Sequence, residues 1–232
     1  MAQHTESVIA AGGHRAARNP VAILKPIVWI ACLAPFAIIV AKIAGFGSLG
    51  PNPVEEVLHT MGKTSLNILW VTLAVTPLRK LTKWNWLLRL RRLLGLFAFF
   101  YLVLHFLTYA ALDLRFDWSW LWTDISERPY ITVGMLALVL MIPLAVTSTK
   151  GWQRRLGRRW TKLHRLVYPI AILGVVHFWW QVKADILQPL IYAVLLALLL
   201  GYRLVDWRAR ERRSRAARRD AAQRRGGQAV GR

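Results

Sequence analysis

Three histidines lie in or beside long apolar stretches of this 232-residue chain. His105 falls inside Leu93–Leu112 and His177 inside Leu166–Val182, while His164 comes just before the second of these stretches. An imidazole in hydrocarbon is costly unless something binds it, so such residues are candidates for a functional site. Neutral imidazole is also a common axial ligand of haem iron. The pattern indicates an integral membrane protein that binds haem.

A plainer interpretation is that these histidines only form hydrogen bonds with neighbouring helices, as polar residues in membrane bundles often do. His59 is expected at the outer end of the second apolar stretch, either as an interfacial polar residue or near the edge of a haem. His4 and His14 belong to a polar tail and are expected to have no specific role.

The histidines must be positioned by helices, because the apolar residues occur in long uncharged runs. A bilayer core needs about 20 mostly apolar residues per helix. The shorter runs reach this length if they include flanks in which a lysine can extend to the interface. We therefore expect an all-α membrane protein, a bundle of six transmembrane helices. The six runs are Ile27–Ala41, Thr64–Leu78, Leu93–Leu112, Tyr130–Thr149, Leu166–Val182 and Ile186–Tyr202.

Charge alternates between the connecting segments and predicts their sides of the membrane. The N-terminal segment, Arg79–Arg92, Lys150–Arg165 and the tail from Arg203 together hold 27 of the 32 basic residues. The intervening connections hold seven of the eleven acidic residues. Basic segments stay in the cytoplasm, so both termini are expected inside and the acidic loops outside. This predicts a multi-pass protein of the bacterial inner membrane.

The net charge of +21 does not indicate a nucleic-acid-binding protein, because the charge follows the loops rather than one folded surface. The basic tail is expected to lie on anionic lipid or to be a solvated, disordered end. We expect a cytoplasmic N-terminal tail at 1–22, a six-helix haem domain at 23–206 and a basic cytoplasmic tail at 207–232. The last span is expected to end by Asp206. The first apolar run has no cleavage-site pattern, which suggests an uncleaved anchor. No internal repeat is evident.

Position along the helices predicts depth. His105 lies 13 residues after Arg92 and His177 lies 15 residues after Lys162, which corresponds to roughly 20 Å and 22 Å at 1.5 Å per residue. Both imidazoles are therefore expected in the outer half of the bilayer at similar heights, as axial ligation of one haem requires. His164 is expected near the cytoplasmic face. Helical phase separates it from His177 by about 220°, unless the helix is perturbed, for example at Pro169.

Short motifs along most of the chain resemble the MsrQ (YedZ) family, part of the ferric-reductase-like transmembrane group. The resemblance covers roughly residues 24–205 and keeps the order of the motifs. They include Leu49-Gly-Pro-Asn-Pro-Val, His59-Thr-Met-Gly62, Thr76-Pro77-Leu78, Arg91-Arg-Leu-Leu-Gly95, Leu104-His105, Arg128-Pro-Tyr130, Thr147-Ser-Thr149, Arg158-Arg-Trp-Thr-Lys-Leu-His164, His177-Phe-Trp-Trp180 and Gln188-Pro-Leu-Ile-Tyr192.

The resemblance implies haem b with His105 and His177 as axial ligands, and His164 as a further family histidine. The wider group often holds two haems, but this chain lacks the inner histidine on the third helix, so a second haem stays open. The family is also associated with FMN. A flavin phosphate would suit the basic cytoplasmic edge, although these same charges could simply set the topology. The residues concerned are Arg91, Arg92, Arg158, Arg159 and Lys162.

Two histidines on one iron leave no open coordination position, which favours electron transfer. One outer haem cannot cross a core of about 30 Å alone, so an inner centre is expected, either FMN or a second haem. The electron donor is expected to be quinol or a separate flavin reductase. The resemblance names the acceptor as MsrP, a periplasmic molybdenum-cofactor methionine sulfoxide reductase. We expect it to dock on the acidic loops with Trp118, Trp120 and Trp122. Alternatives are a stand-alone ferric or quinone reductase and a histidine-relay proton channel or transporter.

Overall fold

The computed structural model describes residues 20–182 and 185–230, with side chains as far as Arg219. The elements of this part of the chain are all helices, which confirms the expectation of an all-α protein. The N-terminal tail with His4 and His14 lies outside the described residues. The α-helices are α1 (Pro20–Ile43), α2 (Pro53–Thr82), α3 (Leu88–Thr108), α4 (Trp118–Glu127), α5 (Pro129–Val146), α6 (Lys150–Leu156), α7 (Arg158–Leu163), α8 (Val167–Gln181) and α9 (Leu187–Val230). Single turns of other helix types lie at Asn85–Leu87, Tyr109–Asp113 and His164–Leu166.

Five helical segments are long and apolar enough to cross a membrane. They are Pro20–Ile43, Asn85–Asp113, Pro129–Val146, Arg158–Gln181 and Leu187–Arg219. The remaining predicted span lies within α2, whose 30 residues make it about 45 Å long. Helix α2 is less apolar than the others, because much of its surface faces protein rather than lipid. Ten of its residues are buried, among them Ser65 and Thr72.

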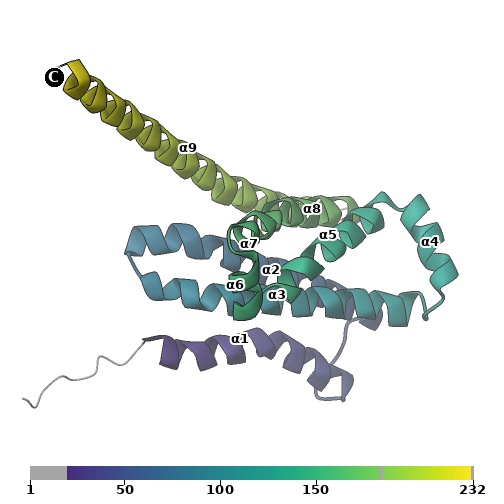
Figure 1. The fold of residues 1–232 in the computed structure, drawn as a ribbon. Coiled ribbons are helices and arrows are strands. Elements are labelled where there is room, and N and C mark those ends of the chain that lie inside the picture. The colour runs from purple at the N-terminus through teal and green to yellow at the C-terminus, as the bar shows by residue number, and fades with distance from the viewer. Residues whose placement is uncertain (1–19, 183–184, 231–232) are drawn as a thin grey trace, which may run out of the picture.

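The centre of the bundle consists of two helix pairs, α2 with α3 and α5 with α8, which make the most extensive contacts in the fold. Figure 1 shows α2 and α3 running side by side over most of their length. The Ser65 hydroxyl donates a hydrogen bond to the Ala98 carbonyl (2.8 Å) and links α2 to α3. Gly174 on α8 lies so close to Leu66 that an added Cβ would stand 3.1 Å from its methyl group. These contacts hold α3 and α8 next to α2.

Helix α1 is attached to the core by one tyrosine. The Tyr101 side chain on α3 is fully buried, and its hydroxyl donates to the Cys32 carbonyl (2.6 Å) and accepts from the Phe36 amide (3.1 Å). These two backbone groups are four residues apart on α1, which is the spacing of an α-helical hydrogen bond. The hydroxyl therefore bridges two backbone groups within one turn of α1.

The chain enters α8 through a change of helix type rather than through a proline kink. His164–Leu166 forms a 3-10 turn between α7 and α8. Pro169 lies in the first turn of α8, where a missing amide donor costs little. The expected perturbation between His164 and His177 is therefore present, but it lies at the 3-10 turn and not at Pro169.

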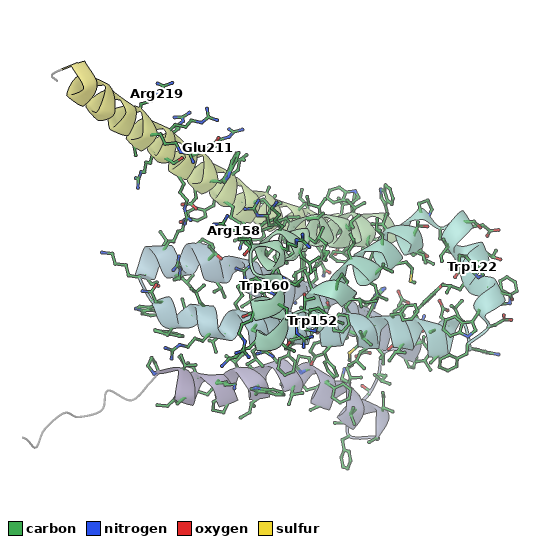
Figure 2. The ribbon with its side chains drawn as sticks, in the orientation of Figure 1. Trp122, Trp152, Arg158, Trp160, Glu211 and Arg219 are labelled. Atoms are coloured by element: carbon green, nitrogen blue, oxygen red, sulfur yellow. The ribbon has the colours of Figure 1, made fainter. Side chains whose placement is uncertain are left out.

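Helix α9 continues to Val230, so the expected end by Asp206 is wrong. This also differs from the expected disordered tail at 207–232. The extension is rich in arginine and alanine, both good helix formers, and has ion pairs one turn apart: Asp206 with Arg210 (3.1 Å) and Glu211 with Arg215 (2.6 Å). Figure 2 shows Glu211 and Arg219 on the part of α9 that extends away from the bundle.

Candidate functional site

His105 of α3 and His177 of α8 face one another inside the bundle. Their ring centroids are 6.1 Å apart and their planes are nearly perpendicular, at 83°. Both line a cavity of about 220 Å³ whose walls come from α2, α3, α5 and α8. The two histidines predicted to lie at matched depth are therefore brought together around a shared space.

Each imidazole is oriented by a main-chain carbonyl on the neighbouring helix. Nδ1 of His105 lies 2.9 Å from the Leu58 carbonyl oxygen, and Nδ1 of His177 lies 2.7 Å from the Tyr130 carbonyl oxygen. A carbonyl only accepts, so each Nδ1 carries the proton and donates it. Nε2 then stays unprotonated and available to a metal, as in other metal-binding histidines whose second nitrogen is anchored.

A glycine leaves room for each ring. A Cβ added to Gly62 would lie 3.0 Å from the His105 ring, and one added to Gly134 would lie 2.8 Å from Nδ1 of His177. Each glycine is four residues after the carbonyl that accepts the histidine proton, and each carbonyl precedes its histidine by 47 residues. The two helix pairs thus share the same arrangement of a carbonyl, a glycine and a histidine. Sequence analysis did not detect this repeat, whose only signal is the matched spacing of two glycines and two histidines.

The spacing of the two rings fits coordination of one iron. Metal–imidazole bonds are about 2 Å long, so two imidazoles on opposite sides of one metal have ring centres about 6 Å apart. The remaining wall of the cavity is largely apolar, with Leu66, Leu69 and Leu138 among its lining residues. The donors and the surroundings therefore fit a buried haem with two histidine ligands.

Polar groups line the same cavity beside the rings. Lys63 of α2 approaches the Phe178 ring at 6.0 Å, and Arg128 before α5 pairs with Asp124 at 3.4 Å. His59 and Gln181 are joined by a 2.7 Å hydrogen bond between their side chains. His59 therefore lines the same cavity as the two facing histidines.

His164 lies away from this cavity, at the start of the 3-10 turn. Its ring stacks on Trp160 with centroids 4.0 Å apart, and its Nδ1 donates to the Trp160 carbonyl at 3.2 Å. Its Nε2 is buried and has no hydrogen-bond partner among the described residues. Arg91 is the charged group that acts on it electrostatically.

The five residues expected to hold a flavin phosphate differ in their burial. Arg91 is partly buried and interacts with Arg203 and Tyr168. The other four side chains are exposed. They are Arg92 on α3 and Arg158, Arg159 and Lys162 on α7. Arg203 of α9, which the sequence did not single out, acts electrostatically on Arg91.

The loop expected to dock a partner contains α4. In Figure 1 this helix lies at the end of the bundle opposite to the C-terminal end of α9. Trp118, Trp120 and Trp122 are 52%, 61% and 72% exposed. Asp117 caps this helix by accepting hydrogen bonds from the Ser119 hydroxyl (2.6 Å) and amide (3.0 Å), which hold the pKa of its carboxyl below the ordinary value. A hollow beside α4 shares Asp113 and Arg128 with the histidine cavity.

Comparison with known proteins identifies the family. Residues 60–175 match the family described as ferric reductase like transmembrane component. The chain is 54% identical over 188 residues to the protein-methionine-sulfoxide reductase heme-binding subunit MsrQ of Rhodospirillum rubrum, covering 81% of this chain and 89% of that protein. It is 47% identical over 208 residues to the MsrQ of Xanthomonas axonopodis pv. citri, covering 88% and 89%. The chain therefore belongs to the MsrQ family and is a multi-pass membrane protein.

Proposed function

We propose that this protein is a haem b electron-transfer subunit that supplies a periplasmic methionine sulfoxide reductase with electrons from the cytoplasmic side of the inner membrane. The observation that carries the proposal is the pair of facing imidazoles, 6.1 Å apart and each with its Nδ1 anchored. The names of the MsrQ relatives, which describe a heme-binding subunit of this reductase, support it.

The proposed haem ligands are His105 and His177. Bound between two imidazoles, haem b supplies a one-electron carrier with no open position for substrate. The Leu58 and Tyr130 carbonyls fix both rings, so little reorganisation accompanies a change of charge at the iron. Because each Nδ1 proton is already held by a carbonyl, this arrangement suits fixed metal ligands better than a proton relay.

Lys63 and Arg128 are the residues proposed to hold the haem propionates, since both line the cavity and both are cationic. The His59–Gln181 pair would close the same edge against water. Asp113 also lines this edge and would keep one side of it anionic. If they hold the propionates, these residues would be the polar contacts of the haem.

We propose six membrane-spanning helices, the five apolar segments together with α2, and both termini in the cytoplasm. The distribution of basic residues supports this orientation. It places His105 and His177 toward the periplasm, in a haem domain spanning 23–206. The exposed tryptophans of α4 then lie on the periplasmic side and form the proposed docking surface for MsrP.

A second electron centre is proposed near His164, because the outer haem alone does not reach the cytoplasmic face. FMN is the centre we favour, with quinol or a cytosolic flavin reductase as donor. The buried Nε2 of His164 keeps a second haem as the other candidate. Measuring haem, iron and FMN per polypeptide distinguishes the two.

The haem proposal is tested with alanine variants of the three histidines in purified protein made with haem available. We expect His105→Ala and His177→Ala each to abolish the bis-imidazole spectrum of the dithionite-reduced protein, because each variant lacks one of the two facing imidazoles. His164→Ala should keep the signal of the outer haem. Absence of haem bands from the wild-type protein would refute the proposal, and loss of all haem from His164→Ala would refute the assignment of ligands.

The choice of acceptor is tested by mixing reduced protein with MsrP or with ferric chelates. Rapid reoxidation by MsrP alone supports the proposed partner. Rapid reoxidation by ferric chelates alone would instead identify a stand-alone ferric reductase with the same haem architecture.

A further inference from the structure

Two arginines on different helices lie at the basic end of the bundle, Arg91 on α3 and Arg203 on α9. The positive charge of Arg203 acts electrostatically on Arg91. Both side chains are partly buried. Like charges in such surroundings are unfavourable unless an anion lies between or beside them.

The contacts of Arg203 use only part of its hydrogen-bonding capacity. Nη2 donates to the Leu73 carbonyl on α2 (2.6 Å), and the guanidinium carbon lies 4.9 Å from the Tyr168 ring centroid on α8. Nε and Nη1 are buried and have no hydrogen-bond partner among the described residues. A guanidinium held by these two contacts, with two free N–H donors, can bind an oxyanion with paired N–H groups.

The described acidic residues at this end do not neutralise the pair. Asp206 is one turn from Arg203 on α9, but its carboxylate is in contact with Lys80 and Arg210. Glu211, further along α9, pairs with Arg215. The Nε2 of His164, which also interacts with Arg91, is a further buried polar atom without a partner.

We propose that Arg91 and Arg203 form a binding site for a phosphate group, with Tyr168 and His164 beside it. A phosphate carries enough negative charge for two guanidiniums and enough oxygen atoms for the free N–H donors. The proposal deepens the flavin part of the proposed function and moves its phosphate site from exposed α7 residues to Arg91 on α3 and Arg203 on α9. It does not depend on the outer haem.

The phosphate could belong to a soluble cofactor such as FMN or to the headgroup of an anionic phospholipid at the cytoplasmic interface. Titrations of the full-length protein with FMN and with riboflavin distinguish them, because the two flavins differ only in the phosphate. Retention of phosphatidylglycerol is measured by lipid analysis of the same preparations. The test variants are Arg91→Gln and Arg203→Gln. Arg165→Gln and Arg208→Gln, which remove exposed arginines at the same end, are the controls.

If the phosphate is that of FMN, wild-type protein should bind FMN at least about tenfold more tightly than riboflavin. Arg91→Gln and Arg203→Gln should remove this preference without weakening riboflavin binding, and Arg203→Lys should retain part of it. If the phosphate is that of a lipid, the two flavins should bind alike and both Gln variants should lose retained phosphatidylglycerol. The controls should match wild type in either case.

Two outcomes would overturn the proposal. In the first, Arg91→Gln and Arg203→Gln match the controls in both flavin preference and retained lipid. In the second, they lose haem while phosphate-dependent binding is unchanged, which would assign the two arginines to the propionates of a second haem. The haem spectrum, recorded on every sample, reports folding. It also separates failure here from failure of the outer-haem proposal, because wild-type protein without haem bands can still show the FMN preference.

Discussion

Main-chain atoms hold both facing imidazoles, so the residues that determine their orientation are those that bring the backbone close. Gly62 and Gly134 do this, because an added Cβ would lie within 3.0 Å of a histidine ring at either position. A separation this short cannot be accepted without moving the ring or the helix. The histidine-to-carbonyl hydrogen bonds therefore depend on two residues without side chains.

We expect Gly62→Ala and Gly134→Ala each to weaken haem binding by about tenfold or more, because supporting contacts of metal ligands typically have effects of this size. Gly134→Ala should be the more severe, since its Cβ would meet Nδ1 of His177 itself at 2.8 Å. Haem content per polypeptide and the reduced absorption spectrum provide the measurement. Gly95→Ala is the matched control, because nothing lies within 4 Å of a Cβ added there. Equal haem retention by all three variants would contradict the role assigned to these glycines.

Lys63 contributes a positive charge to the wall of the cavity. A nearby cation destabilises the oxidised, more positive iron, so Lys63→Gln should lower the haem reduction potential by on the order of 50 mV. A redox titration of the purified protein measures the shift. Lys162→Gln, which removes an exposed lysine on α7, should leave the potential unchanged. A higher reduction potential in Lys63→Gln than in wild type would contradict the expected electrostatic effect of Lys63.

Among the helices, α1 depends on a contact that α3 provides. Tyr101 bridges the Cys32 carbonyl and the Phe36 amide, two groups at the spacing of an α-helical hydrogen bond. In the absence of water, both groups need a partner within the protein. The hydroxyl of one α3 residue thus determines where α1 attaches.

We expect Tyr101→Phe to destabilise the protein by about 1–2 kcal/mol, because two hydrogen bonds are lost inside the membrane. Unfolding in detergent with increasing denaturant measures the change, and haem content should stay at the wild-type level because Tyr101 does not line the histidine cavity. Tyr202→Phe is the control, since the described contact of Tyr202 is between its ring and Lys80. Equal stabilities for the two variants would argue against the bridge.

Helix α2 is proposed to cross the membrane although it is less apolar than the five other spans. It packs against α3, α8 and α9, and its polar residues are used in these contacts. Asn67 accepts a 2.6 Å hydrogen bond from the Tyr192 hydroxyl on α9, and Ser65 binds the Ala98 carbonyl on α3. Because its neighbours cover much of α2, its composition is that of a buried helix rather than of one surrounded by lipid.

At the scale of the whole molecule, the described residues form a helical bundle around the histidine cavity and a long basic helix, α9, that extends beyond this bundle. Figure 1 shows the C-terminal part of α9 extending beyond the other helices. We expect a chain truncated after Arg210 to keep its haem spectrum, because the residues around the histidine cavity all precede that point. Binding to vesicles of anionic lipid should weaken, since each basic residue near such a surface contributes about 1 kcal/mol. Loss of haem on truncation would contradict this division of the chain.

Several features of the protein follow from its sequence because they depend on local composition. The lengths of the apolar runs predicted the helices, since spanning a bilayer requires a minimum number of apolar residues. The buried histidines predicted the kind of site, because imidazole in hydrocarbon needs a partner. Equal depth of His105 and His177 followed from the constant rise per residue of a helix. The end of α9 was misjudged, because helix propensity continues beyond the last apolar residue.

Only the tertiary structure decided which groups meet. Contacts across 47 residues select the Leu58 and Tyr130 carbonyls and make glycine necessary at Gly62 and Gly134. A 3-10 turn at His164 resets the helical phase that regular geometry would predict for α8. The partial burial of Arg91 and its electrostatic interaction with Arg203 likewise depend on how the helices of the bundle are arranged. Composition and periodicity describe each helix separately, whereas these features arise from the rotation and separation of one helix relative to another.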